Sequence, residues 1–460
     1  MTATGDMRAQ AIALHREGRH DAARAAYIAC LADHPRDGGL WTNLGALLRN
    51  MGQADLALQA QERAFALDPD NLVVRNNLAN ILNDLGAHGR SLELRMGLMQ
   101  AQPRQPSHGA LAGKSLRAMG HTDRARQVLD TNIARFPDHA ESRIQRALTL
   151  LTMGDYAQGF ADFAARWDTG ELTPRRMTTP QWQGEDLAGR TILVLPEQGH
   201  GDVLAMARFL PVLRARGAGR VLMVVEKPLA RVMAKIDGVD WIGTHAALQD
   251  RYHLYTDLMD LPRWHFAGGG ALPPPATLHL PEDSRVRARA LVAPHQGRFR
   301  IGVVWTGSQT YRGNSLRSIA HQRFHDWIGL PDVQMFSLYK GPDLAGFTAD
   351  GSDAFILNAG AHDRDFADCA ALMEQMNLVV TTCTVTAHLA GSLGVPVWTL
   401  LHWEPFWMWG QGRDDSPWYP AMQLWRQDKP RDWDGVFARL RPALEQAIAD
   451  WRGAWRRGLS

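Results

Sequence analysis

A 34-residue spacing shared by two residue types constrains the fold of the first third of the chain. The glycines of this series are Gly18, Gly52, Gly86, Gly120 and Gly154. The prolines are Pro35, Pro69, Pro103 and Pro137. Glycine permits a tight turn, and proline, which has no N–H to donate, ends a helix. The pattern predicts helix–turn–helix units that stack because one unit alone cannot bury its apolar face.

The period and the packing residues are typical of the tetratricopeptide repeat. The clearest copy reads WTNLGALLRNMGQADLALQAQERAFALDPD. Its packing residues are Trp41, Leu44, Gly45, Leu48, Ala57, Ala64 and Pro69. We predict a repeat domain over residues 1–165, with four full repeats and a fifth that starts near Arg143 and fades after Phe160. This domain is either a spacer or a concave groove for a protein partner, in which case Asn43, Asn77 and Asn80 are candidate groove residues.

Composition narrows the function of the chain. Fifty basic residues and 48 acidic residues leave a net charge of +2, which argues against a nucleic-acid-binding protein. No apolar run of about 18 residues predicts a transmembrane segment, and no secretory leader is expected. The three cysteines, Cys30, Cys369 and Cys383, are few and scattered, which predicts a reducing, cytoplasmic location.

After Trp167 the periodicity stops, and a linker over residues 166–188 precedes alternating strands and helices. We predict strands in TILVLPE, RVLMVVE, RIGVVWTG, VQMFSLYKG and PVWTLL, and at residues 240–243 and 377–381. The predicted helices span residues 203–216, 228–235, 319–330, 365–375, 385–393 and 433–452. Such alternation indicates two Rossmann-like domains, at residues 189–295 and 296–460, with a ligand cleft at the carboxyl ends of their parallel strands.

Five motifs, in this order, resemble those of bacterial tetratricopeptide proteins whose second half is similar to glycosyltransferase family 9, the heptosyltransferase-like family. The motifs are EQGHGDVLAMARFLP, RIGVVWTGSQTYRGNSLRSI, FSLYKGP, VVTTCTVTAHLAGSLGVPVWTLL and DSPWYPAMQLWRQ. The resemblance implies an α-helical repeat solenoid followed by a GT-B fold, which consists of two Rossmann-like domains. It also implies inverting transfer of a sugar from a nucleotide sugar, without a metal or a further cofactor.

The resemblance implies that Asp202, in the first motif, is the general base. A carboxylate within hydrogen-bond reach takes the proton of an acceptor hydroxyl as that hydroxyl attacks. Gln198, Gly199 and Gly201 are expected to contact the substrate, and the glycines leave room for the sugar. His200 replaces the more usual leucine as a candidate second acid or base, and the following helix start favours an anion. The alternative for Asp202 is a helix cap.

The fourth motif supplies the expected donor site. Thr384, Thr386 and His388 match the family's donor segment, where a helix N-terminus would lie under the diphosphate. Cys383 occupies the position where the family has an aspartate. A cysteine thiol is uncharged near neutral pH unless its pKa is perturbed. His388 is either a ligand or a satisfied core histidine, and Cys383 is either reactive or a buried, inert thiol.

Further candidate substrate-binding residues follow the strands of the second half. Ser308 stands in a turn, and Arg312 or Arg317, the better family match, would face the diphosphate. Lys340 would neutralise a phosphate, unless it is simply solvated. Trp403 belongs to a tryptophan-rich segment that either stacks on sugars and bases or covers an edge of the core.

These observations predict an enzyme whose repeats recruit a protein acceptor and so raise its effective concentration at the cleft. Two alternatives remain open. One is an inactive repeat scaffold with a degenerate transferase half, which Cys383 favours. The other is a transferase of lipopolysaccharide-type sugars. His321 and His325 are four residues apart but lack a third ligand, so we expect no metal site.

Overall fold

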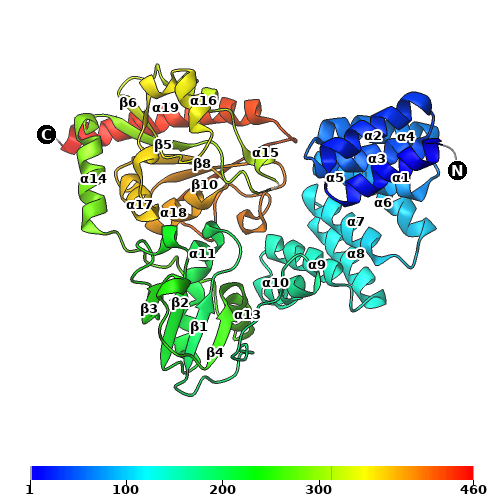
Figure 1. Cartoon of the computed structure of the whole chain (residues 1–460). Coiled ribbons are helices and arrows are strands. Elements are labelled where there is room, and N and C mark those ends of the chain that lie inside the picture. Colours follow the sequence, from blue (N-terminus) through cyan, green and yellow to red (C-terminus); the bar gives the residue numbers. More distant parts are fainter. Residues whose placement is uncertain (1–2, 312, 459–460) are drawn as a thin grey trace. The chain divides into compact units, whose positions relative to one another are not determined.

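A computed structural model describes residues 3–311 and 313–458. The chain divides into two compact units (Figure 1). The first comprises residues 1–153 and 162–173, and the second comprises residues 154–161 and 174–460. None of the described helices combines the length and apolar character that a bilayer crossing requires.

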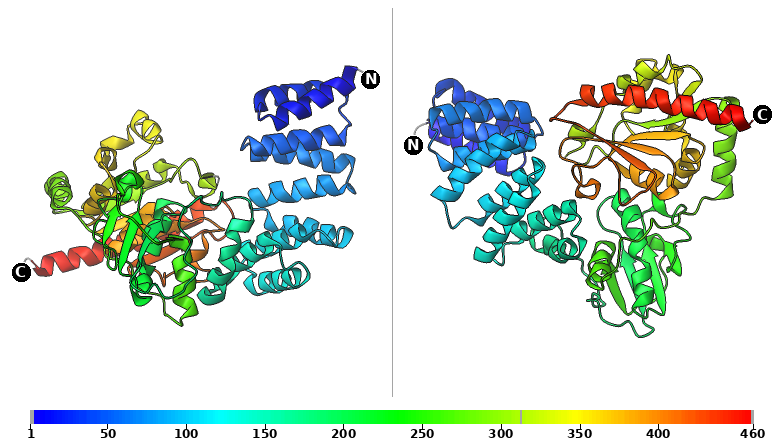
Figure 2. Two further views of the ribbon diagram at one scale, coloured as in Figure 1. Left: turned by 60° about the horizontal axis from the view of Figure 1, so that its bottom comes forward. Right: turned by 180° about the vertical axis from the view of Figure 1, so that it is seen from behind.

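The first unit is a stack of antiparallel helix pairs (Figure 2). The pairs are α1 Ala3–Arg16 and α2 His20–Asp33, α3 Gly38–Asn50 and α4 Ala54–Leu67, α5 Leu72–Asp84 and α6 His88–Ala101, and α7 Pro106–Ala118 and α8 Thr122–Arg135. They confirm the four predicted repeats. A further helix, α9 Ala140–Met153, precedes α10 Tyr156–Phe163, of which residues 156–161 belong to the second unit.

The residues of the 34-residue period lie where the chain changes direction. The five glycines of the series all have a left-handed backbone, with φ between +73° at Gly18 and +85° at Gly154. Residues other than glycine rarely adopt this backbone conformation. The second helix of each of the four pairs ends two residues before a proline of the series, because proline disfavours a helical conformation in the residue before it. The repeat is thus encoded in local backbone preferences.

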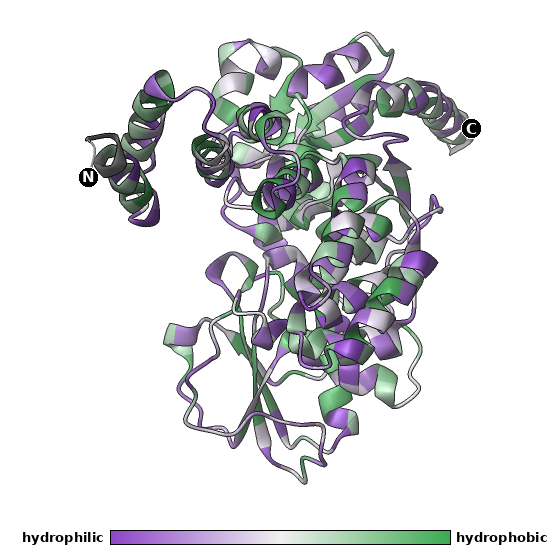
Figure 3. Cartoon of the chain, turned by 90° about the vertical axis from the view of Figure 1, so that its right-hand side faces the viewer, coloured by the Kyte–Doolittle hydropathy of each residue, from purple (hydrophilic) through white to green (hydrophobic). Residues whose placement is uncertain are grey.

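The second unit contains two all-parallel sheets. The smaller has the order β3-β2-β1-β4, with β1 Thr191–Leu195, β2 Arg220–Val224, β3 Trp241–Gly243 and β4 Leu254–Asp257. The larger has the order β10-β9-β8-β5-β6-β7, with β5 Phe299–Val304, β6 Val333–Ser337, β7 Ile356–Asn358, β8 Leu378–Thr382, β9 Val397–Leu401 and β10 Met422–Arg426. The central strands β5, β8 and β9 of this sheet are almost wholly buried and mostly apolar, as cover on both faces requires. Figure 3 shows the hydropathy of the chain along its ribbon.

The strand orders place the topological switch points. Numbered within each sheet, they read 3-2-1-4 and 6-5-4-1-2-3, the latter being the order of doubly wound nucleotide-binding folds. In each sheet the chain first adds strands on one side of its first strand, which is β1 or β5, and then adds the later strands on the other side. Ligands of such sheets bind beyond the carboxyl ends of the strands at this point. The parallel α/β prediction is confirmed, and the switch points lie at β1/β4 and β5/β8.

Helices and 3₁₀ turns connect the strands. The helices are α11 His200–Met206, α12 Pro211–Ala215, α13 Leu261–Ala267, α14 Glu282–Val292, α15 Asn314–Arg317, α16 Leu344–Ala349, α17 Phe366–Met373, α18 Val385–Leu393 and α19 Trp433–Gly458. The helix expected at residues 228–235 is wrong, since only a 3₁₀ turn at Lys227–Leu229 forms there. The helix expected at 203–216 is broken into short pieces, and that at 319–330 is a 3₁₀ segment, His321–Trp327.

Two segments lie elsewhere than the sequence analysis placed them. Residues 174–188, expected to be linker, pack on the smaller sheet, where Trp182 is only 1% exposed and Arg175 donates to Asp257 Oδ1 at 2.5 Å. Residues 154–161, expected to belong to the repeat domain, belong to the second unit. There the Phe160 ring stacks on Phe266 with centroids 5.8 Å apart.

Candidate functional site

The helices that follow the two switch points pack against each other. Helix α11 follows β1 and helix α18 follows β8, and they lie side by side between the sheets (Figure 1). A Cβ atom at Gly201 would lie 2.6 Å from His388 Cδ2 and 3.4 Å from Val385 Cα. The space at Gly201, which we expected a sugar to use, is therefore filled by the His388 ring.

Asp202 lies in the first turn of α11 and is partly buried. Its Oδ2 accepts the N–H of Gly199 at 3.0 Å, so Asp202 helps to cap the helix from the third helical position, while Gly199 rather than Asp202 is the N-cap residue. Burial raises the pKa of Asp202 to about 6, and the charge of Glu197 adds to this, whereas the Gly199 N–H and the positive charge of Arg317 oppose it. Helix α11 spans only seven residues, so it offers a weaker anion site at its start than we expected.

The turn before α11 has a strained backbone. Gln198 is exposed and has φ +66°, a left-handed conformation that is uncommon outside glycine. Its Nε2 lies 3.4 Å from Glu197 Oε1. His200 Nε2 lies 2.8 Å from Glu226 Oε2, and its ring packs edge-on against Phe366. The partner of His200 is thus a carboxylate that follows β2.

Arg317 lies across the second switch point. Its Nη1 donates to the main-chain oxygen of Cys383 at 2.6 Å, and its Nε donates to Asn314 Oδ1 at 3.0 Å. The guanidinium also lies 4.6 Å from the centroid of the Tyr311 ring. In the turn after β5, a Cβ at Gly307 would lie 2.6 Å from Arg317 Nη2, so the guanidinium packs against the bare backbone there. These contacts hold a positive charge at the carboxyl ends of β5 and β8.

Cys383 is a buried thiol held by a donor. Trp409 Nε1 donates to its Sγ at 2.8 Å. Burial raises the pKa of the thiol. The Trp409 hydrogen bond and the Arg317 charge act in the opposite direction but do not cancel the effect of burial. The thiol is therefore uncharged at neutral pH, which favours the inert alternative over the reactive one.

The two threonines of the donor segment form a chain of hydroxyl groups. Thr384 is the N-cap residue of α18, and its Oγ1 lies 2.7 Å from Thr386 Oγ1. Thr386 Oγ1 in turn lies 2.5 Å from Thr381 Oγ1, at the end of β8. All three side chains are buried and their hydroxyls satisfy one another, and Thr381 Oγ1 also donates to the main-chain oxygen of Thr382 at 3.0 Å.

His388 is a neutral, buried imidazole. Burial lowers its pKa to about 3, and the charges of Arg208 and Arg317 add to this. Its Nδ1 lies 3.0 Å from the Tyr419 hydroxyl, and its ring stacks on Trp409. The opposite nitrogen, Nε2, faces the Gly201 position, where a Cβ would lie 3.3 Å away. One edge of the His388 ring is thus packed in the core, and the other edge faces α11.

The remaining predicted residues lie in loops after the strands of the larger sheet. Ser308 is exposed, and its Oγ lies 2.7 Å from Thr310 Oγ1. Lys340 is exposed and donates to the main-chain oxygen of Asp363. The main-chain N–H of Trp403 donates to Gln427 Oε1 at 3.1 Å. The contacts of these three residues do not include Gly199, the hydrogen-bond partner of Asp202. Arg312 lies outside the described residues.

Sequence reasoning missed Arg208 and His402. Arg208 is buried, and its guanidinium lies over the Trp418 and Tyr419 rings. It also donates to the main-chain oxygen of Trp418 at 3.0 Å, which links the turn after α11 to the loop before β10. A single arginine in the apolar run VLAMARFLP was its signal. His402 follows β9, and burial lowers its pKa to about 4. Its signal was a histidine directly after the strand PVWTLL.

The first switch point also carries acidic groups. Asp257, at the end of β4, is 1% exposed, and burial raises its pKa to about 6 although Arg175 opposes this. Glu197 is buried nearby. Within residues 3–311 and 313–458, no group of three His, Cys, Asp or Glu side chains is arranged to hold a metal ion.

Comparison with known proteins identifies the class of the first unit. The sequence profile of the tetratricopeptide repeat family matches residues 39–71. Together with the observed helix pairs, this shows a tetratricopeptide-repeat protein with a parallel-sheet α/β region in its C-terminal half.

Over most of its length the chain is similar to Protein FlbA of Caulobacter vibrioides, with 22% identity over 508 aligned positions. The alignment covers 95% of this chain and 84% of FlbA. Solved structures similar to the repeats include MamA of MSR-1, at 19% identity and a TM-score of 0.32, covering 35% of this chain and 93% of MamA. A thermophilic repeat protein of Thermus thermophilus shows 21% identity and a TM-score of 0.31, covering 36% of this chain and 92% of that protein.

Proposed function

We propose that this chain is an inverting, metal-independent glycosyltransferase of GT-B architecture, whose repeats recruit a protein acceptor. The observation that carries the proposal is the packing of α11 against α18. It brings the switch points of two parallel sheets together, with Asp202 on one side and Arg317 on the other. Ligands bind at such points, and the five-motif resemblance to glycosyltransferase family 9 supports the same reaction.

On the acceptor side, Asp202 is the proposed base. It takes the proton of the acceptor hydroxyl while that oxygen attacks the anomeric carbon and the bond to the nucleotide diphosphate breaks. A single displacement of this kind inverts the configuration at that carbon. A base with a pKa of about 6 is mostly ionised at neutral pH, and this pKa lies close enough to the working pH for efficient proton transfer.

On the donor side, the departing diphosphate gains negative charge. Arg317 and the first N–H groups of α18, which receive no hydrogen bond from the side chain of the N-cap residue Thr384, are the proposed stabilising groups. The neutral imidazole of His388 offers a hydrogen bond rather than a charge. No further cofactor is required, since the nucleotide sugar is itself a substrate.

A second candidate is an inactive scaffold that binds a protein partner through its repeats. The neutral Cys383 thiol favours it, because the family's aspartate is missing and the thiol is already occupied by Trp409. The two candidates differ in whether the α/β region transfers a sugar, since the scaffold would bind a nucleotide sugar without transfer or bind none.

Thermal unfolding of the full chain with UDP-, GDP-, ADP- and CMP-sugars tests the proposal. A ligand at about 100 times its Kd stabilises a protein by about 2.7 kcal/mol, so one nucleotide class should raise the Tm. No shift with any class would refute the transferase and leave the scaffold.

Substitution of Asp202 then separates its two roles. Asp202→Asn retains an oxygen that accepts the Gly199 N–H, but it cannot act as a base. We expect unchanged donor binding and a turnover lower by about 100-fold or more. Asp202→Ala removes the cap as well, so it should also lower the Tm. Equal turnover in Asp202→Asn and the wild type would refute the catalytic role.

A further inference from the structure

Tyr419 is a buried residue to which the proposed reaction gives no role. It lies in the loop before β10, and its side chain is 0% exposed. Its hydroxyl lies 3.0 Å from Nδ1 of His388, and the two rings meet edge-to-face with their centroids 5.7 Å apart. The hydroxyl therefore contacts the edge of the imidazole that is opposite to the edge facing α11.

The hydrogen bond between Tyr419 and His388 contains a single hydrogen atom. Burial lowers the pKa of His388 to about 3, so the imidazole is neutral and carries one N–H. Burial raises the pKa of Tyr419 to about 12, although the charge of Arg208 opposes this, so the phenol keeps its proton. Either the phenol donates to Nδ1, which leaves the imidazole hydrogen on Nε2, or Nδ1–H donates to the phenol oxygen. The hydrogen bond at one nitrogen thus decides which of the two carries the hydrogen.

The charge of Arg208 favours the phenol as the donor. Its side chain is 4% exposed, and its guanidinium lies 5.0 Å from the centroid of the Tyr419 ring. It donates to main-chain oxygens, including that of Trp418 at 3.0 Å, and such neutral acceptors leave the positive charge in place. A positive charge beside a phenol favours loss of its proton, so it strengthens the O–H as a donor and weakens the oxygen as an acceptor. The geometry therefore predicts that Tyr419 donates to Nδ1 and that Nε2 of His388 carries the hydrogen.

The surroundings of the His388 ring fix the direction of this N–H. Trp409 stacks on the ring with centroids 5.1 Å apart and an angle of 29° between the planes. On the edge opposite to Tyr419, a Cβ at Gly201 would lie 3.3 Å from Nε2. Nε2 therefore lies beside the first turn of α11, which also holds Asp202. The N–H is thus held where the helices that follow the two switch points meet.

We propose that Tyr419 is a positioning residue, which holds His388 in the tautomer with its hydrogen on Nε2 so that this N–H donates to the departing diphosphate. The inference rests on the transferase function proposed above and adds the residue that orients the imidazole on the donor side. Without the Tyr419 hydroxyl, the neutral ring is free to place its hydrogen on Nδ1. Nε2 would then present a lone pair, which repels a phosphate oxygen just as the negative charge on the diphosphate grows.

¹⁵N NMR of the full chain, labelled with ¹⁵N-histidine, tests the inference without a nucleotide sugar. The signals of His388 are identified by their absence from the spectrum of His388→Gln. In the wild type at neutral pH, we expect a protonated Nε2 and an unprotonated, hydrogen-bonded Nδ1. In Tyr419→Phe, which lacks only the hydroxyl, both nitrogens should share the hydrogen, so their chemical shifts should approach each other. A hydrogen on Nδ1 in the wild type, or the same tautomer in Tyr419→Phe, would overturn the inference.

Tyr156→Phe is the matched control for the loss of a hydroxyl. The Tyr156 hydroxyl accepts a hydrogen bond from Trp418 Nε1 at 3.1 Å, so this variant disturbs the same loop through the residue next to Tyr419. The signals of His388 should stay where they are in the wild type. A change of tautomer as large as that in Tyr419→Phe would mean that displacement of the loop causes the effect, and it would overturn the inference.

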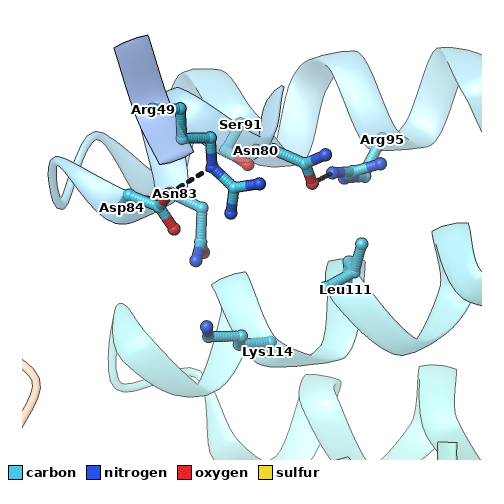
Figure 4. A pocket seen from close by; sticks show the side chains of 8 residues that line it. All are labelled: Arg49, Asn80, Asn83, Asp84, Ser91, Arg95, Leu111 and Lys114. Carbon is cyan, nitrogen blue, oxygen red and sulfur yellow. Dashed lines mark hydrogen bonds and ion pairs between the residues drawn. The ribbon is translucent and has the colours of Figure 1, made fainter. Parts of the chain in front are cut away.

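Arg208→Met tests whether the charge of Arg208 directs the hydrogen. We expect the His388 tautomer to shift part of the way toward a hydrogen on Nδ1. The matched control is Arg95→Met, because Arg95, on α6 of the first unit, is also a buried arginine with neutral partners. Arg95 is 1% exposed, Nη1 donates to Asn76 Oδ1 at 2.5 Å, and Nη2 donates to Asn80 Oδ1 (Figure 4). The control should leave the His388 signals unchanged, and equal effects of the two substitutions would overturn the role of Arg208.

Turnover gives a readout that a purely structural role would not move. The substrate is the nucleotide sugar that raises the Tm, and the assay follows its hydrolysis. In Tyr419→Phe we expect kcat to fall by about tenfold and KM to change by less than about twofold, because the contact strengthens only as the diphosphate departs. Tyr156→Phe should change both by less than about twofold. Equal kcat in Tyr419→Phe and the wild type would overturn the positioning role. Failure of the transferase is distinguishable, because the tautomer is measured without a nucleotide sugar.

Discussion

Replacement of Gly201 by alanine tests the contact between the two switch points. The new Cβ would lie 2.6 Å from His388 Cδ2, whereas carbon atoms in contact are normally about 3.5–4.0 Å apart. His388 cannot easily turn away, because Tyr419 holds Nδ1 and Trp409 covers the ring. Overpacking of this kind costs about 1–3 kcal/mol, and the better helix propensity of alanine returns up to about 1 kcal/mol. We expect a net loss of about 1–2 kcal/mol.

Thermal unfolding followed by tryptophan fluorescence measures this loss. For a unit of this size the Tm should fall by about 2–6 °C. The matched control is Gly346→Ala in α16 of the same unit, where a Cβ meets nothing within 4 Å, so the Tm should stay the same or rise slightly. His388→Ala removes the ring and should therefore cost less in the Gly201→Ala background than in the wild type.

The reasoning would be refuted if Gly201→Ala unfolded at the same temperature as Gly346→Ala. It would also be refuted if the effects of Gly201→Ala and His388→Ala were simply additive, since residues in contact should couple. Either result would mean that α11 and α18 do not approach as closely in solution.

Three further predictions follow from local features. If Asp202 is the base, kcat/KM should rise with pH through about 6, because only the ionised form accepts a proton, and Asp202→Asn should lack this limb; a wild-type profile flat from pH 5 to 8 would count against the role. Gly52→Ala should lower the stability of the repeats by about 1–2 kcal/mol, because φ is +75° with open space around the position, and Gly52→Asn should cost less; equal urea midpoints would contradict this. Native protein should show no rapidly reacting thiol with a disulfide reagent at pH 7.5, because all three cysteines are buried, and full reaction should need denaturant; a fast-reacting thiol at Cys383 would disprove its inert assignment.

The elements that sequence reasoning predicted well have strong local signals. Valine-rich runs such as RVLMVVE and RIGVVWTG gave strands β2 and β5 because buried parallel strands are apolar throughout. Strand β7 has only three residues, and β4 reads LYTD, so neither shows enough apolar sequence to be recognised alone. The helix expected at residues 228–235 failed because an apolar pattern over eight residues is compatible with several turns when tertiary contacts decide.

The sequence predicted where in the fold the candidate site residues lie, but it did not predict which residues they contact. Motifs that follow parallel strands must lie at the carboxyl edge of their sheet, which placed Asp202 at that edge of the smaller sheet and Arg317 and Thr384 at that edge of the larger one. Their partners could not be predicted, because they come from distant parts of the chain. Arg317 meets the main-chain oxygen of Cys383, and the thiol of Cys383 meets Trp409.

The sequence by itself determined the repeat, because its period acts through backbone preferences within 34 residues, such as the left-handed glycines and the helix-ending prolines. It also determined the alternation that makes parallel sheets. Only the tertiary structure decided the charge and protonation of the buried groups. The raised pKa of Asp202, the lowered pKa of His388 and the uncompensated charge of Arg95 all depend on which residues exclude water around them and which charges lie within reach. Electrostatic energies in a low-dielectric interior are set by distances in space, and the order of residues along the chain does not specify these distances.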